Sequence, residues 1–279
     1  MVIAEDSTSN EPLRNAAKGP LPIRAAGLDF ITGRGVAVGA FLLVLLVAWQ
    51  IYSSFMPPVL IPSPARVAAR FVSMWSNQGF LSYAGATVVH VLLSVSITFA
   101  LGMIIALIAY FFPVLNVAVY QRMAPFLNSF PGVGWAFLAL IWFGINSKAV
   151  IFSSAAAMLP LAVINIGAGL RELNRETIEM SVSFSRQAGR RIGLVMLPMM
   201  FPYMFATIRL CFGVSWQIVL IVELLCGAPG LGAVISVARQ RYWTDMIFAV
   251  VFLILIIVFI TDRLIFAKLQ HRIGKAYNA

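Results

Sequence analysis

The sequence contains few charged residues, and a long stretch in its middle has no acid at all. Only 11% of the 279 residues are charged, against about a quarter in soluble domains. Ten residues are acidic, and none of them lies between Asp29 and Glu172. Hydrophobic residues make up 61% of the chain, which is more than a soluble domain of this length can remove from water. These shortages exclude an ordinary soluble globular protein.

Long uncharged runs take the place of the missing charges. Residues 36–56 form an uncharged run, and residues 84–110 contain one histidine and no charged residue. At a rise of about 1.5 Å per residue, either run is long enough to cross the ~30 Å hydrocarbon core of a bilayer. Four further apolar stretches follow, at 132–145, 149–170, 198–222 and 246–266. The sequence therefore predicts an all-α polytopic membrane protein with about six transmembrane helices, the third of them short.

The residues and motifs that most enzyme classes require are also missing. The two cysteines, Cys211 and Cys226, lie at opposite ends of one apolar stretch, roughly 22 Å apart by helical rise, which is too far for a disulfide. No His/Cys spacing fits a metal site, and no G-x-x-x-x-G-K-[ST] loop is present to bind ATP. The predicted spans contain neither H-E-x-x-H nor paired carboxylates. We therefore predict no catalytic residue, no metal site and no bound cofactor, and we expect the protein not to be an enzyme.

The distribution of lysine and arginine predicts the orientation in the membrane. With the N-terminus inside, the cytoplasmic segments hold 14 of these residues and the external segments hold 5, as the positive-inside rule requires. This asymmetry predicts a cytoplasmic tail at 1–35, a transmembrane domain at 36–270 and a second cytoplasmic tail at 271–279. On the predicted outer side, Ser63 before Pro64 is typical of a helix start, and we expect a short surface helix from there to about Gln78.

The charges that remain are concentrated in one predicted cytoplasmic loop, at about 171–193. The loop carries eight charged residues, and several of them recur at helical spacing. It is far longer than a plain connection between two spans. This pattern is typical of a short helix that docks on another protein, although a solvated charged loop would have a similar composition.

The same loop resembles the "EAA" segment of binding-protein-dependent ABC importer permeases. That segment has the pattern Glu-Ala-Ala, three residues, Gly, nine residues, an aliphatic residue, one residue, then Leu-Pro. The matching positions here are Glu179-Met180-Ser181, Ser185, Val195 and Leu197-Pro198. The register is intact, but both alanines and the glycine are replaced. The resemblance covers roughly residues 57–270, and Ile61–Val67 and Leu140–Ile145 are similar to segments of the nitrate/sulfonate/taurine subfamily.

This resemblance implies a role for the chain. It implies the type I permease fold in the bacterial inner membrane. The partners it implies are a second permease chain, expected to be a copy of this one, and two separate ATPase subunits that bind ATP and Mg²⁺. A periplasmic binding protein would deliver a small solute such as a sulfonate, nitrate or taurine-like anion. The residues implied at the ATPase contact are Glu179, Met180, Ser181, Ser185, Leu197 and Pro198.

Four residues are candidates for the translocation path or its gate. Arg209 is a basic residue well inside a predicted span and either attracts an anionic substrate or has a structural partner. Glu223 has a family position at the dimer interface or gate, with interfacial solvation as the alternative. Gln217 either joins helices or lines the path, and Trp142 lies in the subfamily-like segment.

A stand-alone secondary transporter or channel is the alternative function. It would require internal inverted repeats or charged residues along a path. No convincing repeat is visible, and acids are nearly absent from the predicted spans. The sequence therefore favours a subunit that depends on a separate ATPase.

Overall fold

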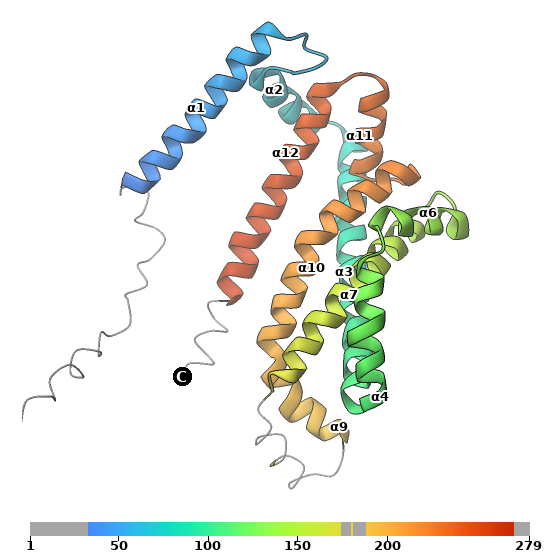
Figure 1. The fold of residues 1–279 in the computed structure, drawn as a ribbon. Helices are drawn as coiled ribbons and strands as arrows, with labels where there is room; N and C mark the ends of the chain where they lie inside the picture. Colours follow the sequence, from blue (N-terminus) through green and yellow to red (C-terminus); the bar gives the residue numbers. More distant parts are fainter. Residues whose placement is uncertain (1–32, 174–179, 181–187, 271–279) are drawn as a thin grey trace, which may run out of the picture. The chain divides into compact units, whose positions relative to one another are not determined.

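The computed structural model describes residues 33–173, 180 and 188–270, and every regular element within them is helical (Figure 1). The elements, in chain order, are α1 (Gly33–Phe55), α2 (Pro64–Met74), α3 (Gln78–Phe111), α4 (Pro113–Asn116), η1 (Val117–Met123), α5 (Ala124–Asn128), α6 (Gly132–Phe143), α7 (Ser147–Arg171), α9 (Ala188–Arg191), η2 (Ile192–Met196), α10 (Leu197–Cys226), α11 (Leu231–Gln240), α12 (Thr244–Thr261) and η3 (Asp262–Phe266). The three η segments are π-helices. The chain divides into two compact units, 1–52 and 53–279, and the bundle described below belongs to the second.

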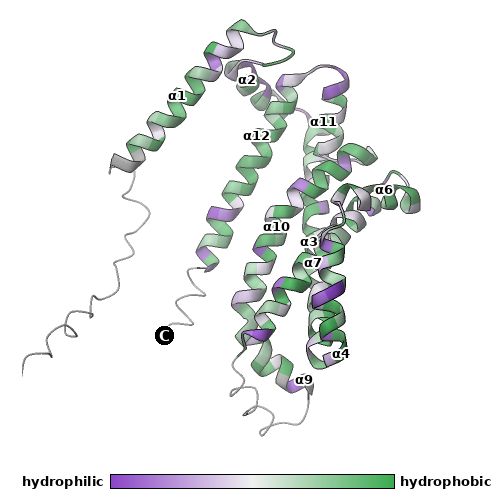
Figure 2. Cartoon of the chain, in the orientation of Figure 1, coloured by the Kyte–Doolittle hydropathy of each residue, from purple (hydrophilic) through white to green (hydrophobic). Residues whose placement is uncertain are grey.

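Five of the predicted spans are confirmed as helices long and apolar enough to cross a membrane: Val36–Phe55, Gln78–Phe111, Ser147–Arg171, Ile192–Cys226 and Thr244–Gln270. Figure 2 shows that apolar residues cover most of α12, with a polar band near its end. Four of the five helices extend one to six residues beyond the predicted bounds at each end, whereas the first ends one residue earlier than predicted.

The third span is the least regular of the six. We expected the 14 residues of 132–145 to cross only with an extension by neighbouring turns or in a locally thinned bilayer. In the structure, α6 has only 12 residues, about 18 Å of rise. It reaches span length only together with Pro113–Asn128, from which it is bent by 86°. The bend falls at Pro131, which is extended and precedes the helix, because a proline cannot continue the hydrogen-bond ladder of the preceding helix.

The predicted surface helix is present as α2. Ser63 caps its first turn by accepting a hydrogen bond from the backbone N–H of Arg66 at 3.4 Å, and Pro64 is its first residue. The helix ends at Met74, earlier than the predicted Gln78, because Asn77 already caps the next helix. The Asn77 side chain accepts from the N–H groups of the first turn of α3.

The centre of the second unit consists of α3, α7 and α10, which pack on one another. Small residues allow close approach between α3 and α7. Gly102 of α3 is buried, and a Cβ placed there would lie 2.9 Å from the Cβ of Ala162 on α7. Such small-residue contacts are typical of helices that associate within a membrane, where lipid tails compete for apolar surface.

We predict that Gly102→Ala destabilises the bundle by about 1–3 kcal/mol, because the added methyl group forces α3 and α7 apart. Gly85→Ala is the matched control on the same helix, since nothing lies within 4 Å of a Cβ at that position. The thermal unfolding midpoint of the purified chain should fall for Gly102→Ala and stay unchanged or rise for Gly85→Ala. Equal midpoints for the two variants would refute the close approach.

Candidate functional site

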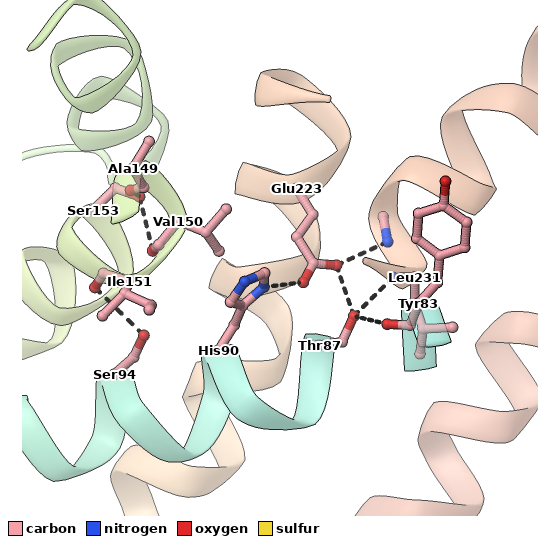
Figure 3. Close-up of polar contacts among 11 residues, drawn as sticks. Tyr83, Thr87, His90, Ser94, Ala149, Val150, Ile151, Ser153, Glu223 and Leu231 are labelled. Atoms are coloured by element: carbon pink, nitrogen blue, oxygen red, sulfur yellow. Dashed lines mark hydrogen bonds and ion pairs between the residues drawn. The ribbon is translucent and has the colours of Figure 1, made fainter. Parts of the chain in front are cut away.

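The most polar buried site among the described residues surrounds the carboxylate of Glu223 (Figure 3). Glu223 is 0% exposed and His90 is 2% exposed. Oε1 of Glu223 lies 2.7 Å from Nδ1 of His90. Oε2 accepts one hydrogen bond from the Thr87 hydroxyl and one from the backbone N–H of Gly232, both at 2.9 Å. We call these four residues the Glu223 cluster; it joins α3, α10 and the start of α11.

The donors on α3 result from its helical repeat. Thr87 and His90 are three residues apart and therefore lie on the same face. The polar stripe continues with Ser94 and Thr98, whose hydroxyls donate to backbone carbonyls of α7, at 3.4 Å to Ile151 and 3.2 Å to Ala155. One face of an otherwise apolar helix thus supplies hydrogen bonds to both of its neighbours. Each polar group on this face is satisfied inside the protein, as a low-dielectric environment requires.

The Glu223 cluster also caps helix α11. Gly230 is the N-cap of α11 and has no side chain to accept from the first free N–H groups. The Leu231 N–H donates instead to Oγ1 of Thr87 at 2.7 Å, and the Gly232 N–H donates to Glu223. A carboxylate at this position is also favoured by the positive end of the helix dipole. Side chains of α3 and α10 therefore fix the start of α11.

The glycines of the α10–α11 turn are required by this arrangement. Gly227 ends α10 with a φ of 64°, in the left-handed region. A Cβ at Gly230 would collide with the Glu223 carboxylate, and one at Gly232 would lie 2.6 Å from the Leu220 carbonyl oxygen. The glycines of this tight turn therefore make room for the Glu223 carboxylate.

Arg209 has a structural partner. Its Nε and Nη2 donate to the two carboxylate oxygens of Asp262 at 2.8 and 2.9 Å, and its Nη1 donates to Oε1 of Gln270 at 2.6 Å. The ion pair is partly exposed, at 37% for Arg209 and 42% for Asp262. It joins α10 to the end of the α12 helix. Arg209 and Glu223 have separate partners and do not pair with each other.

The other two path candidates lie on exposed surfaces. Gln217 is exposed on α10, between the exposed Leu210 and Ile221. Trp142 of α6 is exposed, and its ring packs edge-on against Phe152 at 5.6 Å. The structure thus places three of the four candidates on α10 and one on α6. Arg209, Gln217 and Trp142 therefore lie outside the Glu223 cluster.

Half of the residues of the predicted ATPase contact fall outside the described residues. Glu179, Ser181 and Ser185 lie there, and Met180 is described and exposed. Leu197 and Pro198 begin α10 directly after the π-helix η2. Met196 and Met200 at this junction are fully buried and pack with Ile166 and Leu170 of α7.

The described part of the chain contains no cluster of metal-ligating side chains. No group of three or more His, Cys, Asp or Glu residues converges within residues 33–173 and 188–270. Cys211 and Cys226 are both free and buried, in agreement with their predicted separation. Sequence reasoning did not place His90 or Thr87 in a functional site. The i, i+3, i+7, i+11 spacing of Thr87, His90, Ser94 and Thr98 was the available signal.

Comparisons with known proteins agree with this architecture. Residues 98–273 match the sequence profile of the family described as "Binding-protein-dependent transport system inner membrane component". The taurine transport system permease protein TauC of Escherichia coli is 22% identical, over 81% of this chain and 84% of its own length. The riboflavin transport system permease protein RibX of Chloroflexus aurantiacus is 30% identical, over 74% of this chain and 78% of its own.

A solved structure shares the fold. It is titled "Crystal structure of an amino acid ABC transporter with histidines", and one of its chains superposes with a TM-score of 0.56 at 21% sequence identity. The match covers 74% of this chain and 98% of the other. The helical bundle of the second unit is therefore an established fold of membrane transport proteins.

We predict that Glu223→Ala lowers the free energy of unfolding by roughly 3 kcal/mol, because it leaves buried donors on Thr87, His90 and Gly232 without their acceptor. Asp245→Asn is the control: it removes another acid, whose ion pair with Arg70 at 2.8 Å is partly exposed and is worth at most about 1 kcal/mol. Thermal unfolding in detergent measures both. A Glu223→Ala midpoint no lower than that of Asp245→Asn would contradict the role of the Glu223 cluster.

Proposed function

Because the chain belongs to the family of inner-membrane components of binding-protein-dependent transport systems, we propose that it forms, with a second copy of itself, the path by which a small solute enters the cell. Family membership makes it a multi-pass subunit of the inner membrane and a transport component, not an enzyme. The observation that carries the proposal is the family match over residues 98–273, which includes four of the five confirmed spans in whole or in part.

The coupling of ATP hydrolysis to transport is proposed for the loop at about 171–193. Both ends of this loop are anchored in the same apolar cluster. Leu173 is buried with Met196 and Met200, and the Arg171 guanidinium lies 4.8 Å from the centre of the Tyr120 ring. A force applied to the loop by an ATPase would therefore reach α7 and α10 together. The π-helix η2 at the start of α10 supports this role, because π-helical segments are frequent at functional sites.

The exposed face of α10 is proposed to line the path between the two copies. Gln217 carries an uncharged amide within a span, and its exposure would leave that amide without hydrogen-bonding partners in lipid. A water-filled path or a partner helix would satisfy it. Trp142 is proposed for the same path on the basis of the subfamily resemblance, and its exposure is compatible with that.

The Glu223 cluster is proposed to hold the outer gate. The α10–α11 turn, on the predicted external side, is fastened to α3 through one carboxylate, so α11 cannot shift along α3 without breaking several buried hydrogen bonds. Such a junction makes the outer ends of α3, α10 and α11 move as one body. Rocking between inward-open and outward-open states then requires the flexible parts to lie elsewhere, which agrees with η2 and η3 near the other end.

A sulfonate-, nitrate- or taurine-like anion is the proposed substrate class, on the strength of the likeness to TauC. RibX, by its name, transports riboflavin, so relatives of this chain differ in the class of their substrate. The proposed substrate class is therefore tested directly, by uptake of labelled taurine and nitrate with the neighbouring binding protein and ATPase present. The alternative function, a stand-alone carrier or channel, is separated by omitting the ATPase: uptake that persists without it favours the alternative.

We predict that Glu179→Arg combined with Ser185→Arg abolishes co-purification with the ATPase and reduces ATP-dependent uptake at least tenfold, because two bulky cations enter the proposed docking contact. The matched control is Glu5→Arg with Ser9→Arg, which makes the same changes of residue type in the N-terminal tail. Pull-down of the ATPase and uptake into proteoliposomes are measured. Full assembly and uptake in the loop variant would exclude this coupling site.

We predict that Arg209 acts through Asp262, so the effects of Arg209→Gln and Asp262→Asn overlap. Either single substitution leaves one partly exposed charge unpaired and should cost less than about 1 kcal/mol of stability. The double variant should then be no worse than the single ones in uptake per unit of assembled protein. If Arg209 binds substrate directly, uptake is instead lost in Arg209→Gln and in the double variant but retained in Asp262→Asn.

A further inference from the structure

A narrow groove follows one side of the bundle where α7 meets α3 and the end of α6. Its volume is about 360 Å³, and its lining residues on α7 extend from Lys148 to Leu159. This distance corresponds to about 16 Å of helical rise. Lys148 is the only polar residue of the lining, and all the others have apolar side chains.

The shape of the groove is determined by residues of contrasting size. Ala155 and Ala156 leave a hollow on α7, and Phe143 of α6 and Phe152 of α7 stand beside it with ring centres 5.2 Å apart. The Thr98 hydroxyl donates to the Ala155 carbonyl at 3.2 Å and thereby holds α3 against α7 at this level. The groove is therefore fixed by packed helices and does not depend on a loop.

The width of the groove restricts what can occupy it. A volume of about 360 Å³ spread over ~16 Å corresponds to a mean cross-section of roughly 22 Å². An α-helix with its side chains is ~10–12 Å across, or roughly 80–110 Å² in cross-section. A whole helix is thus too wide to lie inside the groove and would insert only side chains, whereas a single extended hydrocarbon chain is narrow enough to lie along it.

Lys148 adds a charge at one end of this groove. It is exposed in the first turn of α7, and no ion pair joins it to a carboxylate within the described residues. It follows the apolar stretch of α6 and begins a confirmed span, so its ammonium lies at the membrane–water interface, where lysine side chains reach the lipid headgroups. A hydrocarbon-wide groove with an unpaired cation at its interfacial end matches the two parts of an anionic lipid.

We propose that this groove is a binding site for a phospholipid of net negative charge. One acyl chain lies along Ala155 and Ala156 beside the rings of Phe143 and Phe152, and the headgroup phosphate lies at the Lys148 ammonium. The site concerns the lipid around the protein and is independent of the transported solute and of the coupling loop.

The experiment uses the full chain in nanodiscs of phosphatidylcholine that contain a trace of a photoactivatable lipid with a diazirine in its acyl chain. Labelling of residues 149–159 is compared between a phosphatidylglycerol probe and a phosphatidylcholine probe at equal mole fraction. We expect about fivefold more labelling from phosphatidylglycerol, the size of effect that one lysine near an anionic headgroup produces. Lys148→Gln should remove this preference and Lys148→Arg should retain it.

A second variant tests the hydrocarbon part of the site. Ala156→Leu fills the groove and should lower labelling by both probes. Ala157→Leu, at the next residue and outside the lining, should leave labelling unchanged. The comparison requires that the two variants have the same thermal unfolding midpoint. Equal labelling of the native chain by the two probes, or a preference that survives Lys148→Gln, would overturn the proposal. Efficient disulfide cross-linking of two chains through Ala156→Cys would do so as well, because it would show that a second copy covers the groove.

Discussion

The bundle depends on one constraint: in a membrane, a polar group must find its hydrogen-bonding partners inside the protein. The Glu223 carboxylate is the extreme case, since it is 0% exposed and its oxygens are taken by groups on α3 and α11. The same constraint acts on Ser94 and Thr98, whose hydroxyls donate to carbonyls of α7. Polar residues are few, but each of these three joins at least two helices and so determines how those helices pack.

Much of the fold was predictable because membrane spans leave a strong signal in composition and length. Five spans and the capped start of α2 at Ser63 are local properties of the sequence, and each is confirmed. The third crossing was not predictable in this way. Whether α6 continues or bends from Pro113–Asn128 depends on how several prolines are packed, and the 86° bend has no signature in the apolar pattern.

The candidate site was predictable only in part, for a related reason. Glu223 and Arg209 were conspicuous because a charge inside a span is costly. Their partners were not, since Thr87 lies 136 residues from Glu223 and Asp262 lies 53 residues from Arg209. Pairing over such separations follows from tertiary packing, and a single sequence does not record it. The family resemblance indicated candidate positions such as Glu223, but the hydrogen bonds that hold these side chains in place come from the structure.

The surroundings of Glu223 on α10 and of Asp262 on η3 indicate that the two ends of the bundle differ in how easily their helices move against each other. Glu223 sits among fully buried donors, so moving the α10–α11 turn against α3 would leave several polar groups unsatisfied at once. The Arg209–Asp262 pair is more than a third exposed on both sides, and water can replace either partner at small cost. The cluster thus resists relative motion, whereas the ion pair tolerates it. Because η2 and η3 lie beside the tolerant contact and the proposed coupling loop, we infer that conformational change is concentrated there and is carried to the other end by rigid helices.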